Sequence, residues 1–94
     1  MTPLAIAVLR DDLELVMTLL RHGADVNAMC TRTFYQWTAL HAACFRGDFL
    51  VVQCLVQHGA DLHRPDYQGL YAMTLAAVRG QAAVLEFLIQ VKKN

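Results

Sequence analysis

The sequence lacks any long apolar run and any excess charge of one sign. Hydrophobic residues make up 56% of its 94 residues, but they are spread evenly, and no run of about 18 could span a bilayer. The 8 basic residues balance the 8 acidic ones, so no overall field favours nucleic acid. Met1 leads directly into a helical pattern, without the basic start and apolar block of a signal peptide. We therefore expect no membrane and no nucleic acid among its partners.

Cysteines are few, and their number is odd. Cys44 and Cys54 fall inside helical patterns, where they are best interpreted as small buried apolar residues, and Cys30 lies in a loop. Three cysteines in this arrangement do not form a disulfide framework. They indicate a protein of the cytoplasm, the nucleus or both, where thiols stay reduced.

Catalytic and cofactor motifs are also missing. The chain has no glycine-rich phosphate loop, no Cys/His spacing typical of a metal site and no catalytic triad. Cys44 with His41 could form a nucleophile and base in principle, but no orienting acid or oxyanion device accompanies them. We expect no enzyme, no cofactor and no metal site.

What the sequence does contain is a repeat. Residues 19–27 (LLRHGADVN) return as residues 55–63 (LVQHGADLH), 36 positions later. Residues 38–43 (TALHAA) return in weaker form as residues 71–76 (YAMTLA), a further 33 positions on. A period in this range indicates a solenoid of stacked supersecondary units. Solenoids generally bind partners on a continuous face instead of enclosing an active site.

Each copy predicts a pair of helices. In the middle copy Thr38 is a good N-cap, residues 39–46 form a short helix, and Gly47 ends it. A second helix is expected over about residues 48–58, before Gly59. In the first copy Thr2-Pro3 starts the helix, and Asp11 replaces the glycine between the helices. The apolar stripes of the second helices are Leu13, Val16, Leu19 and Leu20; Phe49, Val52, Leu55 and Val56; and Leu85, Leu88 and Ile89.

These motifs resemble the ankyrin repeat. The residues that carry the resemblance are Thr2-Pro3-Leu4, Leu19-Leu20, Gly23-Ala24-Asp25-Val26-Asn27, Thr38, Leu40-His41-Ala42-Ala43, Gly47 and Gly59-Ala60-Asp61. The resemblance implies one all-α domain, a solenoid of antiparallel helix pairs with β-hairpin fingers and repeats of about 1–32, 33–65 and 66–94. It also implies a non-catalytic protein–protein interaction module (an adaptor, scaffold or inhibitor) that binds its partner through the fingers and the concave groove.

The first finger departs from the family pattern. The segment 28–37 is three residues longer than its counterpart 64–70 and contains Phe34, Tyr35 and Trp37, with Gln36 in place of the turn glycine. Either these aromatics protrude as a binding hot spot, or they fold back to cover the junction between repeats. Tyr67 and Leu70 of the second finger are further candidate contacts.

The ends of the first helices form a second candidate site. They carry Leu9-Arg10, Phe45-Arg46 and Val78-Arg79, at positions that face the concave groove in this family. Three arginines beside three apolar residues would suit an acidic or acidic-apolar partner segment. The alternative is a solvated row of cations near helix C-termini.

Other residues have competing interpretations. His22 and His58 occupy equivalent positions, but successive helices lie about 10 Å apart, too far for shared metal ligation. His41 stands where the family uses it to bond nearby backbone. Asn27 is similar to ankyrin asparagines that are hydroxylated, or it is a turn residue bonded to local backbone. Neither end carries an obvious polar cap, so the chain is expected to be part of a longer array or to self-associate.

Overall fold

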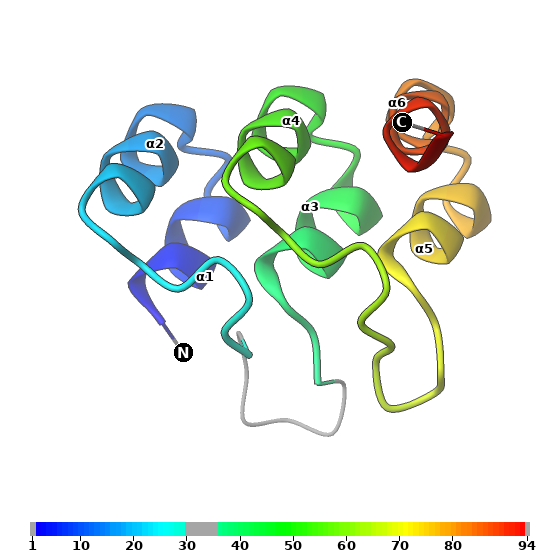
Figure 1. Ribbon diagram of the computed structural model, residues 1–94, viewed down its shortest axis with the longest axis horizontal. Coiled ribbons are helices and arrows are strands. Elements are labelled where there is room, and N and C mark those ends of the chain that lie inside the picture. The colour runs from blue at the N-terminus through cyan, green and yellow to red at the C-terminus, as the bar shows by residue number, and fades with distance from the viewer. Residues whose placement is uncertain (1, 30–35, 94) are drawn as a thin grey trace.

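In the computed structural model, which describes residues 2–29 and 36–93, six α-helices form three antiparallel pairs (Figure 1). The helices are α1 (Pro3–Leu9), α2 (Leu13–Arg21), α3 (Ala39–Arg46), α4 (Phe49–Gln57), α5 (Ala72–Val78) and α6 (Ala82–Lys93). The fold is therefore all-α, as the repeat pattern predicts. Within the described ranges the fingers contain no strand, and the first finger is joined at its base by a single antiparallel bridge between Met29 and Thr38.

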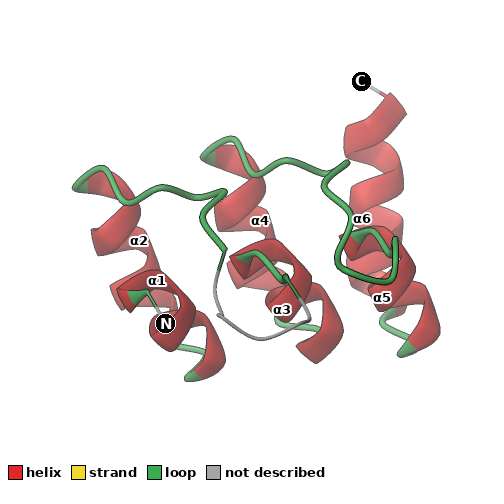
Figure 2. Cartoon of the chain, turned by 90° about the horizontal axis from the view of Figure 1, so that it is seen from below, coloured by secondary structure: helices red, strands yellow, loops and turns green. Residues whose placement is uncertain are grey.

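The helices lie in two layers. The inner helices α1, α3 and α5 form the lower row in Figure 1, and the outer helices α2, α4 and α6 form the upper row. Helix α3 contacts both α1 and α5, and α4 contacts both α2 and α6. Figure 2 shows the same three pairs side by side from below. No helix in the described part of the chain combines the length and the apolar character needed to cross a membrane.

Local sequence explains where the inner helices begin. The Thr2 hydroxyl accepts a hydrogen bond from the Ala5 N–H (3.1 Å), and Pro3 occupies the first turn of α1. Thr38 caps α3 in a capping box with His41, as the sequence predicts for a threonine there. Tyr71 holds the equivalent position before α5 and makes no side-chain cap. The third repeat therefore starts with an uncapped helix.

The turns between paired helices need a left-handed residue. Gly47 has a φ of 81° and Asp11 has a φ of 54°, so the aspartate adopts the conformation that the glycine provides in the second repeat. Gln81 adds a constraint at Gly47, because a Cβ at this glycine would lie 2.2 Å from the Gln81 side-chain oxygen. A larger residue at Gly47 would therefore have to adopt a left-handed φ and also displace the Gln81 side chain.

The core lies between the layers and between successive pairs. Ala7, Ala43 and Ala76 occupy equivalent positions in the three inner helices and are fully buried, which lets neighbouring helices approach closely. The residues of the predicted outer-helix stripes are buried or half-buried, with one exception. In α6 the predicted residue Ile89 is exposed, whereas Val84, which was not predicted, is buried. The prediction for Ile89 was wrong because, within the described residues, α6 has a neighbouring outer helix on one side only.

Candidate functional site

Trp37 joins the first finger to the inner helices. Its ring is half-buried, stacked with the His41 ring (centroids 6.4 Å apart) and tilted against the Phe45 ring (5.2 Å). Its Nε1–H donates a hydrogen bond to Asp66 Oδ2 at 3.1 Å, which connects it to the second finger. Trp37 therefore covers the junction between the second and third repeats. The other candidate aromatics of this finger, Phe34 and Tyr35, lie outside the described residues, as does Cys30.

Asp66 holds the turn of the second finger. Its Oδ1 accepts hydrogen bonds from the backbone N–H groups of Gln68 (2.8 Å) and Leu70 (2.9 Å). Burial acts to raise the pKa of this carboxyl, but the hydrogen bonds from Leu70, Trp37 and Gln68 outweigh it and hold the pKa below its usual value. The carboxylate is thus a charged anchor shared by both fingers. The sequence pattern indicated only a turn here.

His41 connects helix α3 to the same finger. Its Nδ1 accepts a hydrogen bond from the Thr38 N–H (3.1 Å), so the proton is assigned to Nε2, which donates to the Leu70 carbonyl (3.3 Å). The ring is 1% exposed, and this burial lowers the pKa of His41. The neutral imidazole thus bonds local backbone, as the family resemblance implies.

A row of side chains crosses the inner helices from Trp37 through Phe45 to Arg79. The Arg79 guanidinium carbon lies 4.5 Å from the centre of the Phe45 ring, a cation–π arrangement. Val78 beside it is 73% exposed, and Leu9 at the equivalent position of α1 is also exposed. We call Leu9, Arg10, Trp37, Phe45, Arg46, Val78 and Arg79 the inner-helix face.

The arginines of the inner-helix face differ in their surroundings. Arg46 Nε bonds Asp48 Oδ2 at 2.7 Å, and this hydrogen bond, with the charges of Asp48 and Asp11, raises the pKa of the guanidinium. Its positive charge is therefore compensated within the chain. Arg79 lies over Phe45, and Arg10 has no ion pair with any residue in the described ranges. The face thus offers two cations, Arg10 and Arg79, that form no ion pair with any described residue.

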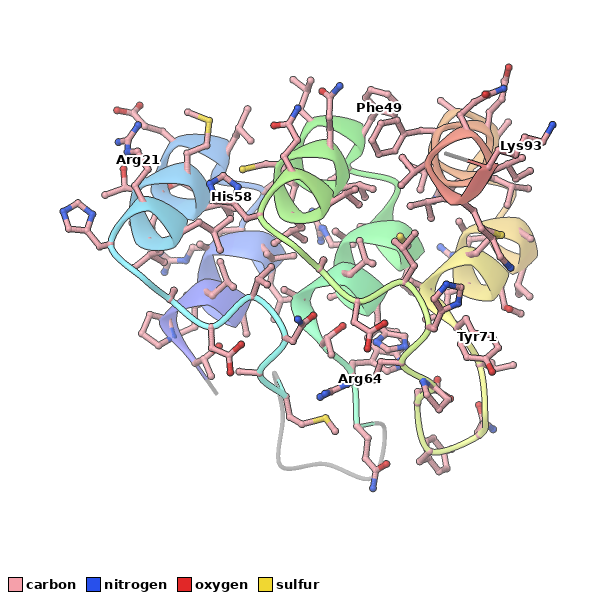
Figure 3. The ribbon with its side chains drawn as sticks, viewed as in Figure 1. Arg21, Phe49, His58, Arg64, Tyr71 and Lys93 are labelled. Carbon is pink, nitrogen blue, oxygen red and sulfur yellow. The ribbon has the colours of Figure 1, made fainter. Side chains whose placement is uncertain are left out.

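Asn27 connects the segments that follow the first two outer helices. Its amide Nδ2 donates to the Gly59 carbonyl (3.2 Å), and its Oδ1 accepts from the Asp61 N–H (2.7 Å). Arg64 reaches back from the second repeat, so that its Nη1 donates to the Asn27 carbonyl at 3.0 Å. In Figure 3 the labelled Arg64 side chain extends from the second repeat toward the first finger. Asn27 therefore bonds the neighbouring repeat as well as its local turn, a role that the sequence pattern did not reveal.

The second finger exposes one aromatic side chain. Tyr67 is exposed at its turn, whereas Leu70 is half-buried and uses its backbone to bond both Asp66 and His41. Of these two candidate contacts, Tyr67 offers its side chain to solvent and Leu70 mainly positions the finger. The exposed glycine Gly69 has a φ of 83°, which suits the turn between them.

The thiols of the described residues are buried and protonated. Burial raises the pKa of the Cys44 thiol to about 12, and burial also raises the pKa of Cys54. A nucleophilic thiolate at either position is therefore disfavoured at neutral pH. In residues 2–29 and 36–93, no three His, Cys, Asp or Glu side chains come together as metal ligands would.

Comparison with known proteins agrees with this architecture. Residues 4–94 match the family of ankyrin repeats in three copies. Members of this family generally bind other proteins and typically lack catalytic activity. A search of curated protein sequences finds no match. Because the family match covers nearly the whole chain and the helix pairs stack as it requires, this chain belongs to the ankyrin repeat family.

Proposed function

We propose that this chain is a protein-binding module that contacts its partner through the fingers and the concave side formed by the inner-helix face, as an adaptor, scaffold or inhibitor does. The observation that carries the proposal is the row from Trp37 through Phe45 to Arg79, with Val78 beside it 73% exposed. Aromatic and arginine side chains supply most of the energy of protein interfaces.

This row is held in place before any partner binds. Trp37 is fixed by the Phe45 ring and by its hydrogen bond to Asp66, and Arg79 is fixed over Phe45. Side chains that are already ordered lose less conformational entropy on binding, which favours affinity. Tyr67 on the second finger and the predicted aromatics Phe34 and Tyr35 on the first extend the proposed surface.

The chemistry of the face favours an acidic-apolar partner segment. Arg10 and Arg79 carry charge that no carboxylate of the described residues pairs at salt-bridge distance, and Leu9 and Val78 lie next to them in the sequence. Arg46 contributes less, because Asp48 compensates its charge. We therefore expect apolar side chains of the partner on Leu9 and Val78, and its carboxylates on Arg10 and Arg79.

Site-specific photo-crosslinking in cells tests this proposal. A photoreactive phenylalanine is placed at Val78, and its matched control is placed at Gln90, which is exposed on the outer helix α6. We expect a discrete crosslinked partner from Val78, weakened by Arg10→Gln with Arg79→Gln, and none from Gln90. Equal crosslinking from both positions, or none from Val78 in a folded chain, would contradict the proposal.

A structural role in a larger array or in self-association is the second candidate. Leu15 on α2 is 39% exposed, whereas Val51 at the equivalent position of α4 is 1% exposed where another pair packs on it. The face around Leu15 therefore suits a further helix pair. Sedimentation at increasing concentration tests this alternative. A mass that rises for wild type but not for Leu15→Asp would favour it, and a constant monomer mass would exclude self-association.

Hydroxylation of Asn27 stays a prediction from the sequence. Both ends of its amide are bonded to the second repeat, at Gly59 and Asp61. We propose that an asparaginyl hydroxylase reaches this residue only when that contact opens. The expected result is a mass gain of one oxygen on the peptide containing Asn27, greater in a destabilised variant than in wild type; no gain in either would remove the proposal.

The thiols favour a reducing compartment. Cys44 and Cys54 are free and buried in the core, where they pack as apolar side chains. We propose that the chain works in the cytoplasm, the nucleus or both. Imaging of a tagged chain in fixed cells tests this location.

A further inference from the structure

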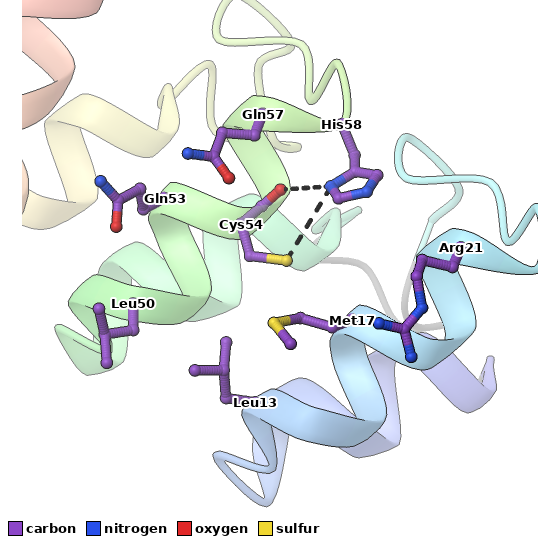
Figure 4. A pocket seen from close by; sticks show the side chains of 8 residues that line it. All are labelled: Leu13, Met17, Arg21, Leu50, Gln53, Cys54, Gln57 and His58. Carbon is purple, nitrogen blue, oxygen red and sulfur yellow. Dashed lines mark hydrogen bonds between the residues drawn. The ribbon is translucent and has the colours of Figure 1, made fainter.

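An open hollow lies between two of the outer helices, on the layer opposite the inner-helix face. It has a volume of about 370 Å³ and lies between α2 and α4 (Figure 4). Its apolar lining comes from Leu13, Met17, Leu50 and Cys54. Leu50 is 59% exposed, so part of this apolar lining is open to solvent. This volume falls in the range of sites that accept small groups.

The repeat itself explains why the hollow exists. At the next step of the stack, Phe49 of α4 and Phe87 of α6 meet edge to face with centroids 5.5 Å apart, and Figure 3 shows Phe49 between these two helices. Counting along the repeats, Phe49 corresponds to Leu13 and Phe87 corresponds to Cys54. Two phenyl rings fill the interface between α4 and α6. A leucine and a cysteine take their places between α2 and α4, and these smaller side chains leave that interface partly unfilled.

The polar part of the lining is cationic or neutral. Arg21 lies at the end of α2, and its Nη2 donates only a 3.3 Å hydrogen bond to the Thr18 hydroxyl. His58 lies across the hollow with Nδ1 bonded to the Cys54 carbonyl at 2.9 Å (Figure 4), which leaves Nε2 for another partner. Two glutamines complete the lining, and none of the described residues that line the hollow is acidic. The hollow is therefore apolar with an uncompensated positive charge at its rim.

We propose that this hollow is a second protein-docking site, which takes an aromatic side chain of a partner segment while an adjacent carboxylate of that segment pairs with Arg21. The aromatic ring supplies the volume that Leu13 and Cys54 leave empty. The carboxylate meets the guanidinium, which has no acidic partner in the described residues. Because the residues that line the hollow all come from α2, α4 and the end of α4, and none belongs to the inner-helix face, a second partner can bind here while the first occupies that face.

Titration with capped dipeptides, followed by NMR of the ¹⁵N-labelled chain, tests this proposal. The probes are Phe-Glu and Glu-Phe, with Phe-Gln and Ala-Glu as counterparts that lack the charge or the ring. We expect shifts of backbone amides on α2 and α4 with the first two probes, about threefold weaker binding of Phe-Gln, which lacks the charge, and much smaller shifts with Ala-Glu, which lacks the ring. Arg21→Gln should weaken binding of the acidic probes by about threefold, the size of an exposed ion pair, and leave Phe-Gln unaffected.

Cys54→Phe is the sharpest variant, because it copies Phe87 and should fill the hollow and abolish the shifts. Leu50→Glu, at a more exposed position, should also abolish them and is the second variant if Cys54→Phe does not fold. Lys92→Gln removes a cation that lines a different hollow and should change nothing. Val78→Asp should likewise leave the shifts intact, which separates this site from the inner-helix face.

Four results would overturn the proposal. The first is binding of Phe-Gln as tight as that of Phe-Glu, and the second is a shift pattern that Cys54→Phe leaves unchanged. The third is free phenylacetate binding as tightly as the dipeptides, which would identify a small carboxylate ligand in place of a protein segment. Dimerisation through α2 and α4 that Cys54→Phe prevents would identify a second copy of the chain and would also contradict the proposal.

Discussion

The hydrogen bond between Trp37 and Asp66 should couple the two fingers measurably. Trp37→Phe removes the Nε1–H donor and keeps an aromatic ring beside Phe45. Asp66→Asn keeps the shape and can still accept the N–H groups of Gln68 and Leu70 through its oxygen. Its NH₂ group, however, would then face the tryptophan N–H, and two donors cannot bond each other.

The expected size follows from the burial of this pair. A hydrogen bond to a charged group contributes about 1.5–3 kcal/mol when buried. Asp66 is 6% exposed but Trp37 is half-buried, so we expect a coupling free energy of about 1–2 kcal/mol from the two single variants and the double variant. Asp66→Ala also loses the acceptor for two backbone N–H groups, and we expect it to cost about 2–4 kcal/mol in total. A chain of this length has a free energy of unfolding of about 5–14 kcal/mol.

Urea unfolding of the four proteins, followed by circular dichroism, measures this coupling. The pKa of Asp66 is held below its usual value, so the contribution of its charge is complete above about pH 4 and is lost as pH falls through the folded pKa. The coupling measured at pH 7 should therefore shrink in strong acid. A coupling energy below about 0.3 kcal/mol at pH 7, which is within the additivity of independent sites, would refute the reasoning.

Three further predictions concern stability. Tyr71→Thr should supply the missing cap of α5 and raise the free energy of unfolding by about 1 kcal/mol over Tyr71→Val, measured by urea unfolding. Gly47→Ala should lower the melting temperature more than Gly59→Ala, because both glycines have positive φ but only a Cβ at Gly47 meets the Gln81 side chain. Burial holds the pKa of His41 below its unfolded value of about 6.5. The stability that the neutral ring contributes should therefore be fully present above about pH 6.5. Between that pH and the folded pKa, the free energy of unfolding should fall by up to about 1.4 kcal/mol per pH unit. His41→Asn should reduce that slope in urea titrations at several pH values.

Much of the fold follows from short-range patterns in the sequence. Helix ends depend on local requirements that single residues meet. An N-cap starts the helix at Thr2 and at Thr38, and a left-handed φ ends it at Asp11 and at Gly47. The stripe of α6 was predicted less well. Periodicity places Ile89 on the apolar side of its helix, but whether that side is covered depends on a neighbour that periodicity does not describe.

The contacts between repeats could not be predicted in the same way. Asp66 is recognisable as a turn residue, yet its bond to Trp37 joins positions 29 residues apart. The Gln81 amide likewise reaches the Phe45 carbonyl across 36 residues, at 3.1 Å. The three arginines look alike in the sequence, and only their neighbours in space distinguish Arg46 from Arg79. Such differences depend on how the pairs stack, which a repeat pattern alone does not specify.

The central claim is that a partner binds the inner-helix face. The most direct test is to measure how tightly the partner binds a chain in which one residue of that face is changed. Once crosslinking has identified the partner, its Kd should be measured for wild type, Val78→Asp and the control Gln90→Asp. Val78 is 73% exposed, so the substitution should leave the fold intact. We predict at least about tenfold weaker binding for Val78→Asp, equivalent to about 1.4 kcal/mol, and no change for Gln90→Asp. An unchanged Kd for Val78→Asp would contradict the account.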